Sequence, residues 1–197
     1  MGKRISNIKC NTIRTFRDLD ARGKEHGKFY GWTPGPGAIG TGETAKKYQW
    51  KQNGDIITEY HIDITGLACK GTAANDVIGL GSGGAAAYID QYVESTHGIA
   101  YRCEVICVEA PGEGTATITA NIDIAFNTSA ALAYDGAAGA AEIALGAHVK
   151  GGVFVDEALG LTSTDYMYLV EGDNAATTGV YDAGQLIIRL YGHPAMS

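Results

Sequence analysis

The chain has 197 residues, 45 per cent of them hydrophobic, which suits one globular domain and excludes a disordered protein. Glycine is abundant, at 28 residues, whereas proline is scarce, at 4. Many glycines between short hydrophobic runs are typical of an all-β protein with many turns. No run is hydrophobic and long enough to cross a membrane, and no hydrophobic stretch follows the first four residues, so we expect neither a membrane span nor a secretory signal.

The net charge of −7 conceals two oppositely charged parts of the chain. Residues 1–51 hold 11 of the 15 lysines and arginines but only four acids, which gives this part a charge of +7. Residues 52–197 therefore carry −14. A basic first quarter on an acidic body predicts an arm that binds something acidic, either nucleic acid or the body of a neighbouring copy. A solvated tail is the alternative interpretation.

The first 42 residues are predicted to form this arm, extended and ending in a Gly/Pro hinge, with a body over residues 43–197. Basic and aromatic side chains are interleaved along it. The residues that we expect to contact a partner are Arg14, Phe16, Arg17, Arg22, Lys24, Lys28, Phe29, Tyr30 and Trp32. Nucleic acid would use such a mixture, and so would an adjacent subunit. The subunit is favoured, and nucleic acid is not expected, because the acidic body would repel it.

The body begins near Lys46 with a predicted hairpin, in which the turn sequence Asn53-Gly54 separates two alternating runs. In the second run we expect Ile56, Tyr60, Ile62 and Ile64 to share one face, with polar residues opposite. Further strands are expected at 76–80, at 87–93, where a short helix is the alternative, and at 98–108, which is central because it is hydrophobic on both faces. A turn at Pro111-Gly112 is expected to follow.

The clearest strand pattern covers residues 115–126. Its even positions are hydrophobic and its odd positions are polar, except at Ala125, which predicts one buried face and one wet face. Residues 127–160 are rich in Ala and Gly and are expected to form loops and short strands. Two more strands, at 166–170 and 185–191, close the domain. About eight strands without a long helix predict a β-sandwich or a jelly roll with an extended N-terminal arm.

Two patterns suggest a binding site, and each also has a structural interpretation. Residues 79–84 satisfy G-x-G-x-x-G, but no alternation of strand and helix follows, so a hairpin loop is favoured over a dinucleotide site. Glu59, His61 and Asp63 line one face of a strand and could hold a metal, as in cupin enzymes. The paired histidines of those enzymes are missing here, so the polar outer face of a half-buried strand is favoured.

The remaining reactive residues fit no catalytic pattern. The four cysteines, at 10, 69, 103 and 107, have no metal-ligand spacing and are expected to be small buried residues. Asp173, Asn174 and Asp182 fit no known calcium-binding loop, and a solvated turn is favoured. Neither G-x-S-x-G nor HExxH occurs. We therefore expect no enzyme, no cofactor and no metal site.

Two segments of the body, IITEYHIDITG at 56–66 and YLVEGDNAATTGVYDAGQLIIRLYG at 168–192, resemble small structural proteins of tailed bacteriophages. In such phages, small β-sandwich or jelly-roll proteins often decorate the capsid as cement proteins, commonly as trimers that clamp neighbouring capsid subunits. The resemblance implies a virion protein that is assembled in the host cytoplasm. Its partners would be the major capsid protein and copies of itself, bound through the basic arm.

The alternative that we weigh against a decoration protein is a carbohydrate- or receptor-binding module of a phage tail fibre or spike. Sugar sites usually show an exposed aromatic platform flanked by Asp and Asn. Asp173, Asn174 and Tyr181 could form such a platform. A cupin-like metalloenzyme is the third class.

Overall fold

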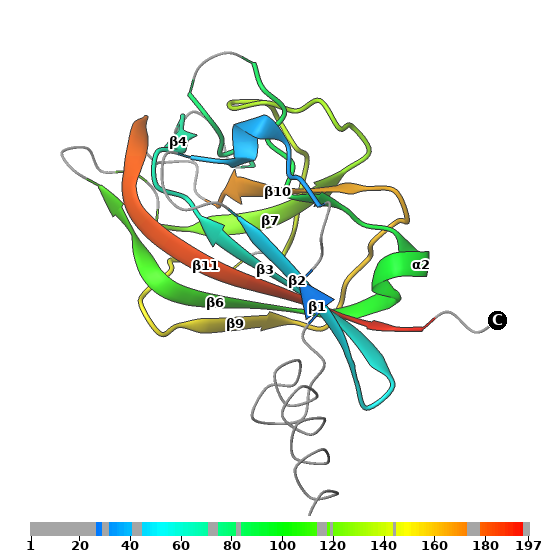
Figure 1. Ribbon diagram of the computed structural model, residues 1–197. Coiled ribbons are helices and arrows are strands. Elements are labelled where there is room, and N and C mark those ends of the chain that lie inside the picture. Colours follow the sequence, from blue (N-terminus) through cyan, green and yellow to red (C-terminus); the bar gives the residue numbers. More distant parts are fainter. Residues whose placement is uncertain are drawn as a thin grey trace, which may run out of the picture.

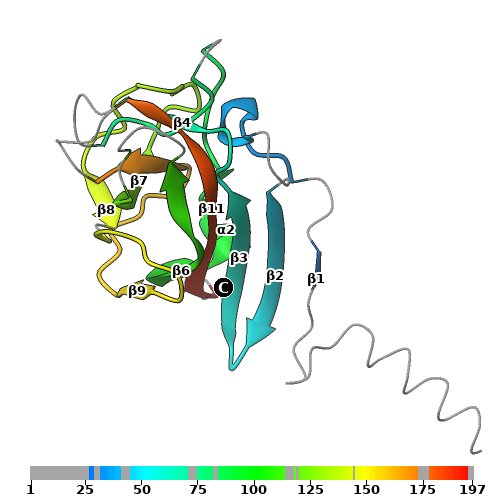
Figure 2. The ribbon, with the colours of Figure 1, turned by 90° about the vertical axis from the view of Figure 1, so that its left-hand side faces the viewer.

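The structure is a computed structural model that describes residues 27–28, 32–40, 45–70, 75–81, 84–113, 118, 120–143, 145–172 and 178–194. Two antiparallel sheets, of seven and four strands, form a β-sandwich (Figures 1 and 2). The prediction of an all-β sandwich is therefore confirmed, whereas the strand order does not confirm a jelly roll. No helix in the described part of the chain has the length and hydrophobicity that a membrane span requires.

The large sheet has the order β1-β2-β3-β11-β6-β9, and β4 pairs with β11 beside this path. Its strands are β1 (Gly27–Lys28), β2 (Lys46–Gln52), β3 (Asp55–Asp63), β4 (Ala68–Cys69), β6 (Ile99–Glu113), β9 (Val153–Asp156) and β11 (Gly179–His193). The small sheet has the order β5-β10-β7-β8. Its strands are β5 (Asp90–Gln91), β7 (Ile122–Asn127), β8 (Ala141–Ile143) and β10 (Tyr166–Glu171). The helical elements in the described part are η1 (Pro36–Ala38) and α2 (Glu94–His97).

The expected hairpin of β2 and β3 is confirmed. Asn53 and Gly54 both have positive φ angles, of 55° and 94°, as the tight turn between paired strands requires. Tyr60, Ile62 and Ile64 are buried in the core, as predicted from their alternation. The next strand in the sheet, β11, pairs with β3 on one side and with β6 on the other, so the three longest strands are adjacent.

The core lies between the two sheets, and side chains of alternate residues on each strand fill it. Its large-sheet contributors include Tyr60, Ile62, Ile64, Cys103, Val105, Cys107, Leu186, Ile188 and Leu190. Its small-sheet contributors include Ile122, Ile124, Met167 and Leu169. The prediction of buried cysteines holds for Cys69, Cys103 and Cys107, whereas Cys10 lies outside the described residues. Burial raises the pKa of the Cys103 thiol, which favours its neutral, unreactive form.

The expected turn at Pro111-Gly112 is wrong, because β6 continues through it to Glu113. This end of the strand pairs irregularly with the start of β11, with register shifts between Tyr181 and Leu186. Such bulges place extra residues against a partner strand, so a proline that cannot donate a hydrogen bond is tolerated there. The predicted strand at 76–80 is also wrong in type, since these residues form isolated bridges instead.

The small sheet has a covered outer face, which corrects the prediction of a wet face around β7. Asp123 is only 5% exposed, and its Oδ1 atom accepts the backbone N–H of Leu145 at 2.7 Å. A second small hydrophobic cluster lies on this sheet and comprises Val77, Ala87, Ala125, Ala138, Tyr168 and Val170. The Ala- and Gly-rich segment between β7 and β9 supplies part of this cover, because small side chains allow close approach of its backbone. Residues 115–117 and 119 of the predicted strand lie outside the described residues.

The segment that we expected to act as a hinge is bound to the body at 32–40. The N–H of Gly35 donates to the carbonyl of Tyr88 at 2.8 Å, and the N–H of Gly37 donates to that of Ala86 at 2.7 Å. The carbonyl of Gly37 in turn accepts the N–H of Leu80. A Cβ atom on Gly37 would lie 2.2 Å from the carbonyl oxygen of Ala85. This close approach requires glycine, so the backbone contact is specific to the sequence.

Gly37→Ala should therefore lower the free energy of unfolding by roughly 1–3 kcal/mol, because the added methyl group would force the two backbones apart. Urea unfolding followed by tryptophan fluorescence measures this change. Thr33→Ala, at an exposed position of the same segment, is the control and should change stability little. Equal midpoints for Gly37→Ala and the unsubstituted protein would show that the segment is not held against the body.

Candidate functional site

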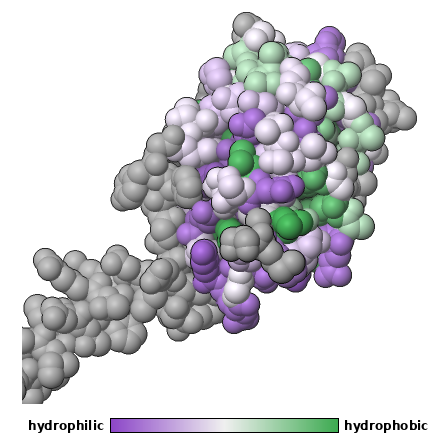
Figure 3. All heavy atoms as spheres, turned by 90° about the vertical axis from the view of Figure 1, so that its right-hand side faces the viewer, coloured by the Kyte–Doolittle hydropathy of each residue, from purple (hydrophilic) through white to green (hydrophobic). Residues whose placement is uncertain are grey.

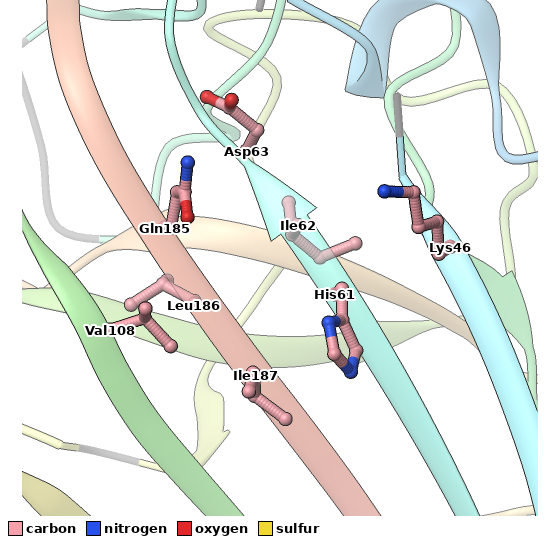
Figure 4. A pocket seen from close by; sticks show the side chains of 8 residues that line it. All are labelled: Lys46, His61, Ile62, Asp63, Val108, Gln185, Leu186 and Ile187. Carbon is pink, nitrogen blue, oxygen red and sulfur yellow. The ribbon is translucent and has the colours of Figure 1, made fainter. Parts of the chain in front are cut away.

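A shallow groove of about 290 Å³ lies on the outer face of the large sheet (Figure 4). Strands β2, β3, β6 and β11 all contribute to it. Its lining residues are Lys46, His61, Ile62, Asp63, Val108, Gln185, Leu186 and Ile187. In Figure 4 the side chains of Val108 and Ile187 lie at the lower left of the groove, with Gln185 and Asp63 above them and His61 and Lys46 to their right. The groove thus has hydrophobic side chains at one end and hydrogen-bonding groups beside them.

Strand register explains why these residues meet. Lys46 lies opposite His61, which lies opposite Ile187 on β11 and then Ile106 on β6. Asp63 lies opposite Gln185 in the same way. Because alternate side chains point to opposite faces, each of these residues faces outward while its neighbours fill the core. The predicted common face of His61 and Asp63 is therefore confirmed.

Glu59 lies on the same face of β3, but it is held by protein partners. Its Oε2 atom accepts the Nε–H of Arg189 at 2.5 Å, and its Oε1 atom lies 2.7 Å from Nε2 of His61. Burial acts to raise the pKa of Glu59, but the hydrogen bonds from these two partners outweigh it and hold the pKa below its ordinary value. In the part of the chain that the structure describes, no group of three His, Cys, Asp or Glu residues is arranged to hold a metal ion.

The ion pair of Glu59 extends across the sheet to β6. Nη1 of Arg189 lies 3.6 Å from Oε2 of Glu104, and the hydroxyl of Tyr191 donates to that same oxygen at 2.7 Å. The guanidinium of Arg102 lies 5.0 Å from the centre of the Tyr191 ring. Burial, followed by the hydrogen bond to Glu104, raises the pKa of Tyr191 to about 12. These contacts join β3, β11 and β6, so their role is to hold the strands of the sheet together.

A second polar cluster is buried between the sheets. Nζ of Lys47 lies 2.5 Å from Oδ2 of Asp90, and the hydroxyl of Tyr60 donates to that oxygen at 2.6 Å. Nε2 of His97 lies 3.3 Å from it. The side chains of Lys47 and His97 are 3% and 2% exposed, so the cluster is almost closed to solvent. It joins β2 and β3 of the large sheet to β5 and α2.

The surroundings of this cluster keep its carboxylate charged. Burial acts to raise the pKa of Asp90, but the hydrogen bond from His97 and the charge and hydrogen bond of Lys47 outweigh it and lower that pKa. Burial and the charge of Asp90 raise the pKa of Tyr60 well above its ordinary value. Figure 3 shows the side of the molecule that contains α2, where hydrophobic residues form small groups among polar ones. Because these groups are paired with one another and nearly closed to solvent, loss of one of them would leave a buried polar or charged group without its partner.

Only two of the predicted arm residues lie in the described part of the chain. Lys28 belongs to β1, opposite Tyr48 on β2. Trp32 is partly buried against the core, with its ring 5.8 Å from that of Tyr60. The others, Arg14, Phe16, Arg17, Arg22, Lys24, Phe29 and Tyr30, lie outside the described residues.

The predicted sugar platform at Tyr181 is wrong. Tyr181 is fully buried, its N–H donates to the carbonyl of Leu67, and burial raises its pKa far above the ordinary value. Asp173 and Asn174 lie outside the described residues, while Asp182 is exposed. After the glycine motif at 79–84, the described residues form no helix before β5, although a dinucleotide site would need one there. Comparisons of the chain with protein-family models, curated proteins and solved structures find no match.

The sequence did not point to the buried cluster, since Lys47 and Asp90 are 43 residues apart. A signal was nevertheless present. Lys46 and Tyr48 face outward on β2, so Lys47 between them must face the core, opposite Tyr60 on β3. A lysine at a core position requires a buried anionic partner.

Asp90→Asn should lower the free energy of unfolding by roughly 3–5 kcal/mol at pH 7, because it leaves Lys47 charged and buried without its carboxylate. The folded-state pKa of Asp90 is lowered, so its stabilising effect is complete above the ordinary value of 3.8 and is lost as the pH falls through the folded-state pKa. The difference between the two proteins should therefore shrink below about pH 4. Urea unfolding from pH 7 to pH 3 measures it.

Asp135→Asn is the matched control, because it makes the same substitution in an ion pair, with Lys70, that is about one-third exposed. We expect it to lower the free energy of unfolding much less than Asp90→Asn does, because solvent screens an exposed pair. A cost for Asp90→Asn no larger than that of this control would show that the buried cluster does not stabilise the sandwich.

Proposed function

We propose that the protein is a non-enzymatic structural protein of a tailed-phage virion, a capsid decoration protein that binds the head through its basic N-terminal arm. The observation that carries this proposal is where the arm meets the body. Gly27 and Lys28 pair with Gln49 and Tyr48, so the first described part of the arm, residues 27–28, is an added strand at the edge of the large sheet. Strand addition at an edge is a common way in which chains join neighbours.

The charges of the arm and the body support the same role. Residues 1–26 hold seven Lys and Arg and three acids, and they precede β1. A basic segment that precedes a strand at a sheet edge can contact an acidic surface of an adjacent protein. The major capsid protein is the partner that we propose, with neighbouring copies of this chain beside it.

The polar clusters of the described body favour a structural protein over a catalyst. Glu59 and Asp90 are each paired with a basic side chain of the body, and Tyr60 lies beneath the surface with Asp90. Catalytic groups need access to a substrate, whereas these groups hold strands together. Their chemistry is thus explained by the fold.

Replacing Arg14, Arg17, Arg22 and Lys24 together by Gln should weaken binding to empty heads of the phage that encodes the chain by roughly tenfold or more. The reason is that the four cations would no longer attract the acidic surface. Sedimentation of the protein with the heads over a concentration series measures the affinity. The full-length chain is used, because a deletion of residues 1–42 would also remove Trp32 and the segment bound to the body.

A variant in which Lys46, Lys51, Lys70 and Lys150 are together replaced by Gln is the control for a change in net charge, since it also removes four positive charges and all four residues belong to the body. It should bind the heads almost as well as the unsubstituted protein. Equal binding by the arm variant and this control would refute the arm as the attachment element. If the unsubstituted protein does not sediment with the heads, the decoration role itself is refuted.

The groove on the large sheet favours one second candidate, a carbohydrate- or receptor-binding module of a tail fibre or spike. The volume of this groove lies close to the lower limit for small-molecule sites. The imidazole of His61 and the amide of Gln185 line it together with hydrophobic side chains. Such groups can donate and accept hydrogen bonds with sugar hydroxyls while Val108 and Ile187 contact the ring.

His61→Ala with Gln185→Ala should weaken any glycan binding in this groove by roughly tenfold, because each removes a hydrogen-bonding group. A glycan array with the unsubstituted protein identifies the ligand, and titration calorimetry compares the variants. His193→Ala is the control, as it removes an exposed imidazole elsewhere. An array without hits would exclude this candidate.

A further inference from the structure

We propose that the open edge of β9 is a self-association surface, at which β9 pairs antiparallel with β9 of a second copy across a two-fold axis. This inference does not depend on the proposed virion role. It would extend the large sheet of each copy into one continuous sheet.

Exposed hydrophobic side chains gather around this edge. Six large hydrophobic residues in the described part of the chain are at least 40% exposed, and four of them belong to β9 or lie beside it. The four are Val108 at 40%, Val149 at 62%, Val153 at 54% and Val155 at 47%. Such a concentration of exposed valines is typical of a contact surface, whereas single exposed hydrophobic residues are common on any protein.

The backbone of β9 is open on the side away from β6. The strand order of the large sheet ends at β9 among the described residues, and Figure 1 shows β9 at the border of the sheet. The N–H of Cys107 on β6 donates to the carbonyl of Gly152, so that carbonyl points toward β6. Because backbone groups alternate in direction along a strand, those of Val153 and Val155 point to the open edge.

The sequence of β9 is complementary to itself. Phe154 packs in the core, so Val153 and Val155 share the outer face. Antiparallel strands can pair only residues of the same face directly opposite each other. Placing Val153 opposite Val155 of the partner subunit satisfies this condition twice across the two-fold axis. Both valines also direct their backbone groups to the open edge, so the register yields four backbone hydrogen bonds.

The flanking charges fit the same register. Lys150 precedes β9 and Glu157 follows it, and both are exposed. An antiparallel arrangement brings Lys150 close to Glu157 of the partner subunit, and the reciprocal pair forms on the other side. The partner that fits this edge is therefore a second copy of the chain. It places a valine opposite each valine and an opposite charge at each end of the paired strands. This two-fold contact is distinct from the trimer that the phage resemblance implies.

Cysteine cross-linking tests the register. Val153→Cys and Val155→Cys are made separately in a full-length Cys10→Ser background, in which the remaining cysteines, at 69, 103 and 107, are buried. Opposite residues of a hydrogen-bonded pair have Cα atoms about 5.5 Å apart, within disulfide range, whereas the diagonal distance of about 7–8 Å between two copies of residue 153 is not. A mixture of the two variants should therefore oxidise to the mixed dimer roughly tenfold faster than either variant alone. Equal rates would overturn the register.

Solution mass tests the contact itself. The unsubstituted protein should form dimers, and Val153→Lys with Val155→Lys should raise the dissociation constant roughly tenfold or more, because lysines would then face lysines. Val180→Lys, at another exposed valine on β11, should leave it unchanged. A protein that stays monomeric up to about 100 μM would overturn the proposal. If the β9 variant instead loses only binding to phage heads, the edge receives a capsid partner and self-pairing is overturned, while the virion role stands.

Discussion

The pairing of β11 between β3 and β6 is the constraint on which the rest of the structure depends. β3 and β6 share eight and eleven register pairs with β11, and the alternation of side chains along these strands fixes two surfaces at once. Leu186, Ile188 and Leu190 fill the core, while Gln185, Ile187 and Arg189 face outward. A shift of one residue in this register would bury Arg189 and expose the core side chains. The groove and the ion pairs on the outer face are therefore consequences of the same pairing that forms the core.

Local signals in the sequence predicted the local parts of this arrangement. The hairpin of β2 and β3 was predictable because Asn53-Gly54 determines the turn and the alternation of β3 determines its faces. The turn predicted at Pro111-Gly112 failed because bulges against β11, some 70 residues later in the chain, carry β6 through it. The wet face predicted for Asp123 failed because distant loops cover the small sheet. In both cases the outcome depends on packing against segments that are distant in the sequence. The pattern of residues within one segment contains no information on such packing.

The candidate sites follow the same division. His61 and Asp63 could be placed on one face from alternation alone, but their neighbours Gln185 and Val108 come from strands far along the chain. Glu59 and Arg189 are 130 residues apart in the sequence. Because they form an ion pair, Glu59 is a cross-strand contact and not a free metal ligand. The sequence alone shows only that a carboxylate is present. Its partner in the fold shows whether it is free to bind a ligand or is already held in an ion pair.

The two edges of the large sheet differ in a way that bears on how the protein meets its neighbours. At one edge, β1 covers β2, so the backbone groups that face Gly27 and Lys28 have partners within the same chain. At the other edge, β9 has only four residues, and its valines remain exposed. Natural proteins usually protect an open edge with charges, prolines or a covering segment, because an open edge invites pairing. Here the charged residues are Asp156, the last residue of β9, and Lys150 and Glu157 beyond its ends, whereas Val153 and Val155 carry no charge. Such an edge favours a partner strand with matching charges at its ends over one without them. Both strands would gain the hydrophobic contact, but only the matching one would also form the ion pairs.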